Sequence, residues 1–245
     1  MPANRELKRV LALFQQRISR APLASKLGHL REALKRLTAE RYQFHYGKLE
    51  ENKESAHFDS VNREIVMDTG LRDQQPDFQA AILAHEIQHA YDHFRRRPYS
   101  LESEARAFKA EAIYLSALDV NVLAAAARDF YGYMWFDYLF EGRIAYLEGP
   151  DAFDEFVNGY FVKSRLGHSF EGLETIPKLL EDASGALRHK EARLKRQKNR
   201  SGWAQPEIAR ILKAQIRMLG DLQNTLRRED RHNKTHHLPL VAANQ

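Results

Sequence analysis

The chain has 245 residues, enough for one large domain or two small ones, and 43% of them are hydrophobic, which is sufficient for a sizeable core. It contains no cysteine, which excludes a disulfide framework, favours a reducing compartment and restricts any metal site to His, Asp and Glu. The net charge of +5 is uneven, because fourteen Lys/Arg and five Asp/Glu lie between Ala186 and Lys234, so only this basic C-terminal quarter suggests a nucleic-acid or acidic partner.

Two amphipathic helices are predicted at the start of the chain, because apolar residues recur there at steps of three and four. The residues are Leu7, Val10, Leu11, Phe14 and Ile18, and after Pro22 they are Leu23, Leu27, Leu30, Leu34 and Leu37. This stretch lacks the apolar run of a secretory signal, and the sequence contains no run of about 18 apolar residues. We therefore expect a soluble, cytoplasmic protein without a membrane partner.

A small antiparallel sheet is expected after these helices. Aromatic residues alternate with polar ones in Tyr42–Tyr46, and Arg63–Met67 is predicted to form a second short strand. Pro76 suits the first turn of a helix, where its missing N–H group costs nothing. That helix contains the sequence AILAHEIQHAYD, Ala81–Asp92, which has apolar residues on both sides and is therefore expected to be buried.

Helices are predicted for most of the remaining chain. Ser100 is expected to cap the next helix, which follows a break at Arg95–Pro98. Further helices are expected at residues 120–127, 129–147, 152–162, 186–200 and 206–228. The sequence therefore predicts an α+β fold that is predominantly helical, with additional C-terminal helices.

Two histidines and a glutamate stand inside the segment expected to be buried. Positions four apart on a helix are separated by about 40° around the axis and about 6 Å along it, so His85 and His89 can reach one ion. Glu86 lies close to such an ion but is angled away from it, where a carboxylate can accept a proton from a metal-bound water and deliver it to a leaving amine. This is the arrangement of the HExxH motif, and we interpret it as a zinc site.

A catalytic zinc ion also needs a third protein ligand and one open position. The longer HExxHxxGxxH pattern fails, because Asp92 and Arg95 stand where its glycine and third histidine should be. The third ligand is therefore expected to be a glutamate of the next helix, with Glu102, Glu104 and Glu111 as candidates. Glu102 lies early in the first turn, whereas Glu104 and Glu111 lie seven residues apart on one face, and we favour Glu104.

The segments HEIQHAYD and EARAFKAEA together resemble the gluzincins, a group of zincin metallopeptidases. The resemblance covers residues 42–118 and implies that a downstream glutamate is the third ligand and that the strand before the active-site helix pairs with extended peptide substrate. Glu104 has the family spacing, since Ala107 follows three residues later, and so does Glu102, which is followed by Ala105. Many gluzincins also carry an aspartate four residues beyond the glutamate to orient a histidine. That position is Arg106 or Phe108 here, depending on the glutamate, so Asp92 is the expected substitute.

The fold and function follow from this resemblance. Residues 1–185 are expected to form a zincin-like metallopeptidase domain, and residues 186–245 a basic helical extension packed on the same domain with a flexible tail from His232 onward. The domain is expected to act as a zinc-dependent peptidase on a peptide or protein substrate. In this hypothesis Zn²⁺ is the cofactor, Glu86 is the general base, and the metal ligands are His85, His89 and Glu104.

Two other interpretations stay open. The zincin fold could serve a regulator or sensor whose basic C-terminal region binds nucleic acid, although a run such as Arg188–Arg200 is more often a solvated helix face. The chain could also be a helical interaction protein whose histidines bind no metal. The aromatic residues after Phe130 are expected in the core, with Tyr131, Tyr133 or Tyr138 as a candidate donor to an oxyanion.

Overall fold

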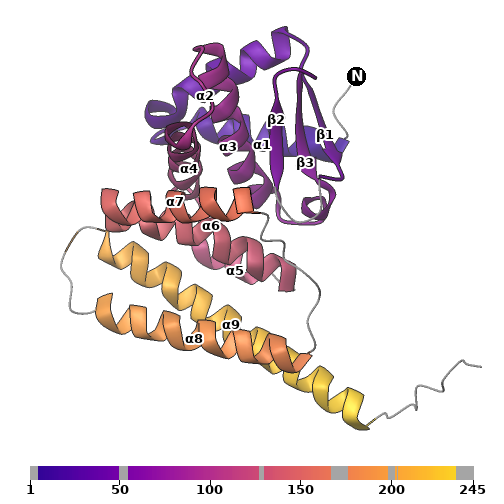
Figure 1. The fold of residues 1–245 in the computed structure, drawn as a ribbon, viewed down its shortest axis with the longest axis vertical. Coiled ribbons are helices and arrows are strands. Elements are labelled where there is room, and N and C mark those ends of the chain that lie inside the picture. Colours follow the sequence, from indigo (N-terminus) through magenta and orange to yellow (C-terminus); the bar gives the residue numbers. More distant parts are fainter. Residues whose placement is uncertain are drawn as a thin grey trace, which may run out of the picture. The chain divides into compact units, whose positions relative to one another are not determined.

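The computed structural model describes residues 5–49, 55–126, 130–166, 176–197, 202 and 204–235. The chain divides into two compact units, Met1–Glu171 and Gly172–Gln245. The first unit contains a small sheet and the helices α1–α7, and the second contains α8 and α9 (Figure 1). The described part of the chain is thus an α+β fold in which helices predominate, as predicted.

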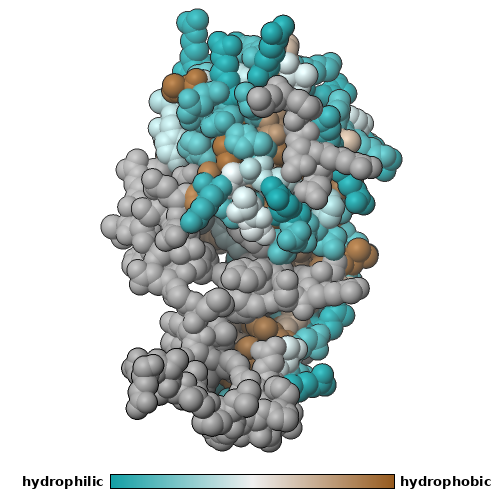
Figure 2. Space-filling model, turned by 90° about the vertical axis from the view of Figure 1, so that its right-hand side faces the viewer, coloured by the Kyte–Doolittle hydropathy of each residue, from teal (hydrophilic) through white to brown (hydrophobic). Residues whose placement is uncertain are grey.

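The helices of the first unit follow the predicted pattern closely. They are α1 (Arg5–Ile18), α2 (Leu23–Ala39), α3 (Pro76–Phe94), α4 (Leu101–Leu115), α5 (Val120–Ala126), α6 (Phe130–Glu148) and α7 (Pro150–Leu166). The apolar residues that recur along α1 and α2 are buried, as Phe14 and Leu30 illustrate. On the face that Figure 2 shows, the exposed side chains of this unit are mostly hydrophilic and the apolar ones form small patches. Apolar burial therefore accounts for the periodicity of the sequence.

The sheet is mixed, and the prediction of an antiparallel sheet is wrong in one respect. The strands β1 (Gln43–Gly47), β2 (Ala56–Asp59) and β3 (Glu64–Asp68) lie in the order β1-β3-β2. β3 is antiparallel to β2 but parallel to β1, so the two predicted strands are neighbours that run in the same direction. The cause is β2, whose four residues are too few for their alternation to stand out from the polar sequence around them. Because β2 forms the hairpin with β3, β1 joins the other edge of β3.

α3 is the central helix of the first unit, where it contacts α1, α2, α4 and β2. Thirteen of its 19 residues are buried, including apolar residues on both sides of the histidines, such as Ile82 and Ile87. Pro76 occupies its first turn, as predicted, and Asp77 beside it forms an ion pair of 2.8 Å with Arg17 of α1. This packing holds the HExxH segment rigidly inside the unit.

The second unit is a helical hairpin in which α8 (Ile176–Gln197) packs against α9 (Gln205–Thr235). The division predicted at residue 185 falls inside α8, which is continuous through Gly185. α9 is continuous through Gly220 and ends at Thr235, later than predicted. The first residues of the expected flexible tail, His232 to Thr235, therefore belong to this helix, and the rest of the tail lies outside the described residues. Among the described helices, none combines the length and the apolarity that a membrane crossing requires.

Candidate metal centre

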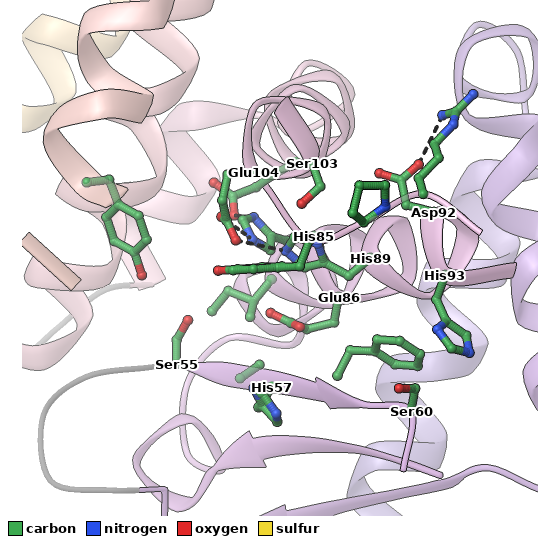
Figure 3. Close-up of a pocket in the computed structure, with 18 of the residues that line it drawn as sticks. Ser55, His57, Ser60, His85, Glu86, His89, Asp92, His93, Ser103 and Glu104 are labelled. Atoms are coloured by element: carbon green, nitrogen blue, oxygen red, sulfur yellow. Dashed lines mark hydrogen bonds and ion pairs between the residues drawn. The ribbon is translucent and has the colours of Figure 1, made fainter. Parts of the chain in front are cut away.

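α3 and α4 bring two histidines and a glutamate together. Nε2 of His85 lies 3.4 Å from Oε2 of Glu104, and Nε2 of His89 lies 3.3 Å from Oε1 of the same glutamate. One ligand atom from each residue can be chosen so that all three lie within 4.8 Å of one another, and the three side chains point toward a common region (Figure 3). Imidazole nitrogens and a carboxylate oxygen are a donor set that catalytic zinc uses. The cluster could therefore hold a metal ion, and its chemistry fits zinc.

Glu104 is the one candidate glutamate that joins this cluster. The side chain of Glu102 is 88% exposed and lies 3.7 Å from Arg106, away from the histidines. Glu111 is buried and reaches the same cavity, but its Oε2 lies 3.8 Å from Nδ1 of His85, the other ring nitrogen. The three candidate glutamates thus have different surroundings. Of the three, only Glu104 faces the Nε2 atoms of both histidines.

The connection between α3 and α4 brings Glu104 level with His89. The chain reverses at Arg96, which has a positive φ of 56° and so leaves the helical conformation. Ser100 then caps α4, as predicted, and exchanges hydrogen bonds with Ser103 in a capping box. Glu104 follows immediately, so the cap fixes the point on α4 at which the carboxylate approaches the histidines.

Asp92, the residue expected to orient a histidine, is instead engaged by two arginines. Its carboxylate accepts hydrogen bonds from Nε of Arg106 at 2.8 Å, Nη1 of Arg97 at 3.0 Å and Nε2 of Gln88 at 3.2 Å. Asp92 is 2% exposed, so these bonds satisfy a buried charge. Because Arg106 lies two residues after Glu104, the network ties the end of α3 to the part of α4 that carries the third candidate ligand.

Hydrogen bonds hold the metal-free cluster together. Burial opposes ionisation of Glu104, yet the hydrogen bonds from His85 and His89 hold its pKa well below the usual range. Burial lowers the pKa of His89, but the hydrogen bond to Glu104 and the charges of Glu86 and Glu104 outweigh it, so the pKa is raised. At Glu111, burial and the neighbouring carboxylates raise the pKa well above its usual value. The cluster therefore consists of two imidazoles and one carboxylate, and the carboxyl groups of Glu86 and Glu111 line the same cavity.

The side chain of Glu86 extends from α3 toward the strand β2 and faces the same cavity (Figure 3). It is buried, and burial raises its pKa against the opposing charges of His85 and His89. A carboxyl group whose pKa is raised is a stronger base than an ordinary carboxylate, and can accept and then release a proton. The position and surroundings of Glu86 thus suit a group that moves protons beside the cluster.

Two tyrosines from α6 and α7 also line the cavity. Tyr138 and Tyr160 hydrogen-bond through their hydroxyl groups, and their ring centroids are 5.6 Å apart. Burial raises the pKa of both phenols, that of Tyr160 to about 12, while their mutual bond raises the pKa of Tyr138 and lowers that of Tyr160. Two linked phenols beside the cleft therefore supply hydroxyl groups that can donate or accept hydrogen bonds.

Only one of these two tyrosines could be predicted from the sequence. Tyr138 was among the predicted oxyanion donors, whereas the side chains of the other two candidates, Tyr131 and Tyr133, lie outside the described residues. Tyr160 was missed, because it lies in a helix that carries no motif and reaches the cavity only through the packing of α7 against α4. The aromatic segment otherwise contributes to the core, as expected, through Phe136 and Phe140.

The cavity is a cleft of about 380 Å³ beside the edge of the sheet. β2 contributes Ala56, His57 and Phe58 to its lining, and among the described strands β2 is an edge strand, paired with β3 alone. β3, the strand that was expected to pair with substrate, is central and has both edges occupied by strands. The connection between α3 and α4 adds Tyr99, which is 67% exposed and has its ring centroid 5.7 Å from that of His89.

Comparisons with protein-family models, with curated proteins and with solved structures find no match for this chain. Its function is therefore inferred from the geometry of the site and from the resemblance of the two motif segments to gluzincins.

Proposed function

We propose that the protein is a zinc-dependent peptidase of the gluzincin type, with the metal held by His85, His89 and Glu104. The observation that supports this most is the convergence of two imidazoles and one carboxylate within 4.8 Å beside a cleft. Three protein ligands leave a further position open, which distinguishes catalytic zinc sites from structural ones. A zinc ion bound there would supply a nucleophile at neutral pH by lowering the pKa of water, and would polarise the scissile carbonyl.

Glu86 is the proposed general base. It takes a proton from the attacking water and delivers it to the nitrogen of the leaving amine, so that the amine departs neutral. Three observations support this role: Glu86 directly follows His85, lines the cleft, and is buried away from bulk water. Because its carboxylate is outside the ligand cluster, replacing it leaves the proposed ligands intact.

β2 is the proposed binding edge for an extended peptide. An edge strand presents unpaired backbone N–H and C=O groups, and a substrate backbone that adds to the sheet gains affinity without dependence on its sequence. β2 borders the cleft through Ala56 to Phe58, so a peptide along this edge passes beside Glu86 and the histidines. This arrangement favours a peptide substrate over a compact small molecule.

Tyr160 is the proposed hydrogen-bond donor to the oxyanion that forms when the peptide carbonyl is attacked. It lines the cleft, and its hydrogen bond with Tyr138 orients the phenol. Tyr160→Phe is expected to lower kcat about 100-fold, the cost of one lost oxyanion donor, with the zinc affinity unchanged. Tyr138→Phe should have a smaller effect. Steady-state kinetics with matched zinc titrations would contradict the role if Tyr160→Phe kept the kcat of the parent protein.

The peptidase proposal is tested by metal analysis and hydrolysis assays on the full-length chain. The purified protein, reconstituted with zinc, is expected to bind one ion per chain and to cleave members of a mixed peptide library, scored by mass spectrometry. Glu86→Gln should keep the zinc and lower turnover about 10²–10⁴-fold, the usual contribution of a general base. Glu102→Gln is the matched control, because its side chain is exposed and outside the cluster. Retained turnover in Glu86→Gln, or a parent protein that binds no metal, would refute the proposal.

A further inference from the structure

His85 has a ring nitrogen whose partner the proposed metal site does not supply. If a histidine binds a metal through Nε2, its Nδ1 carries the proton, and a buried N–H group needs an acceptor. Nε2 of His85 faces Glu104, so Nδ1 is the nitrogen that points elsewhere. The carboxyl group of Glu111 is there, with Oε2 3.8 Å from Nδ1, longer than a hydrogen bond in the metal-free protein.

Glu111 has the complementary requirement. It is 3% exposed on α4, and its Oε2 lies 3.8 Å from Nδ1 of His85. A buried carboxyl group without a hydrogen-bond partner is costly. Ionised or neutral, it presents an oxygen that can accept the Nδ1 proton. Nδ1 of His85 can therefore donate a hydrogen bond, and the carboxyl group of Glu111 can accept it.

α4 also restrains the ring of His85 from a second side. Phe108 packs against it edge-on, with ring centroids 4.6 Å apart, at the position where many gluzincins carry the orienting aspartate. Glu111 lies one turn beyond Phe108, and two turns beyond Glu104, on the same face of the helix. One helix therefore carries the third ligand, a packing contact and an acceptor.

We propose that Glu111 is a positioning residue, which accepts the Nδ1 proton of His85 and so holds Nε2 toward the metal. The inference rests on the proposed metal site. A carboxylate behind a metal-binding histidine fixes the ring orientation and tautomer and makes the imidazole a stronger ligand. In this chain that carboxylate comes from Glu111, and Asp92 serves the α3–α4 connection instead.

The test compares two substitutions of similar length in the full chain. Glu111→Gln keeps an acceptor oxygen, whereas Glu111→Met removes it and still fills the space. Zinc dissociation constants are measured by competition with a chromophoric chelator, and melting temperatures are measured on the metal-free proteins. Glu111→Met is expected to weaken zinc binding about 10–100-fold and Glu111→Gln less than about tenfold, because outer hydrogen bonds contribute on this scale. Glu102→Gln should change neither quantity.

The outcomes separate this inference from the proposed function. Zinc binding by Glu111→Met as tight as that of the parent overturns the positioning role and leaves the metal site standing. A Glu111→Gln variant that loses zinc as completely as His85→Ala shows that Glu111 is itself a ligand, which also overturns the role. A parent protein without zinc affinity removes the proposed function. If Glu111→Met does not fold, Glu111→Ala takes its place and is judged by the same affinities.

Discussion

The two helical hairpins, α3–α4 and α8–α9, both bury polar side chains but arrange them differently. In α3–α4 the buried polar groups include His85, Glu86, Glu104 and Glu111, which reach a single cleft. In α8–α9 the buried polar groups of the described residues are one lysine and three glutamines distributed along the two helices: Lys190, Gln197, Gln215 and Gln223. Burial of polar residues therefore does not by itself identify a site. The α3–α4 hairpin differs because its buried polar groups converge on one cleft and three residues there could hold a metal ion.

The second unit also carries exposed basic residues on α8. Arg188, Lys195 and Arg196 lie on the solvent side of α8, as a solvated basic helix would place them. Nucleic-acid binding by this region stays a prediction. Salt-dependent binding of a duplex oligonucleotide that persists in Glu86→Gln would support it.

The largest expected contrast between the hairpins concerns the metal. His89→Ala should abolish stoichiometric zinc binding, because it removes one of three ligands. It should also remove the stabilisation by zinc, about 4 kcal/mol at a free concentration 1,000 times Kd in the parent protein. Gln215→Ala in α9 removes a fully buried polar side chain and should leave zinc content unchanged. Metal analysis and thermal melts with and without zinc measure both effects; stoichiometric zinc in His89→Ala would break the comparison.

Much of the α3–α4 hairpin could be predicted, because local sequence determines it. Pro76 and Ser100 define where the two helices begin, and the spacing of His85 and His89 places their rings on one side of α3. Glu104 could be preferred over Glu102 because a chain that leaves α3 must return several residues before it is level with His89. These are consequences of helix geometry and capping, which depend on neighbouring residues.

The contacts that depend on the path of the whole chain could not be predicted. β1 and β3 had visible patterns, but their parallel pairing depends on β2, which was not recognised. Asp92 was assigned to a histidine, whereas Arg106, 14 residues away, claims its carboxylate. Tyr160 reaches the cleft from α7, and no periodicity specifies which helix will pack there. Side-chain partners across elements are set by tertiary packing, which local patterns do not encode.

A smaller effect is expected from pH, and it acts on the α3–α4 hairpin. Since the pKa of His89 is raised above its usual 6.5, its contribution to metal-free stability is present below that pH and is lost as the pH rises through the folded pKa. Since the pKa of Glu104 is lowered from 4.5, its contribution is present above that pH and is lost on acidification. Zinc needs deprotonated histidines. Its affinity therefore increases over the same pH range in which the interaction between protonated His89 and Glu104 is lost.

The gap in melting temperature between zinc-loaded and metal-free protein should therefore be wider near pH 8 than near pH 5.5. Differential scanning fluorimetry, with a chelator in the metal-free sample, measures it. Glu102→Gln should show the same widening, since that carboxylate is exposed. A gap of equal size at both pH values would contradict the assignment of the titrating groups to the metal site.

The smallest contrast uses the same substitution in both hairpins. Gln88 of α3 joins two partners, with Oε1 2.7 Å from Nε2 of His29 and Nε2 donating to Asp92, so Gln88→Leu leaves two groups short of a hydrogen bond. Gln223 of α9 donates to Ser184, whose hydroxyl keeps its own bond to a backbone carbonyl oxygen. Gln88→Leu should lower the free energy of unfolding of the metal-free protein by about 1–3 kcal/mol, and Gln223→Leu by less than about 1 kcal/mol. Urea unfolding measures both. Equal losses of unfolding free energy would contradict this expectation. They would mean that a buried glutamine linked to two side chains contributes no more to stability than one linked to a single hydroxyl group.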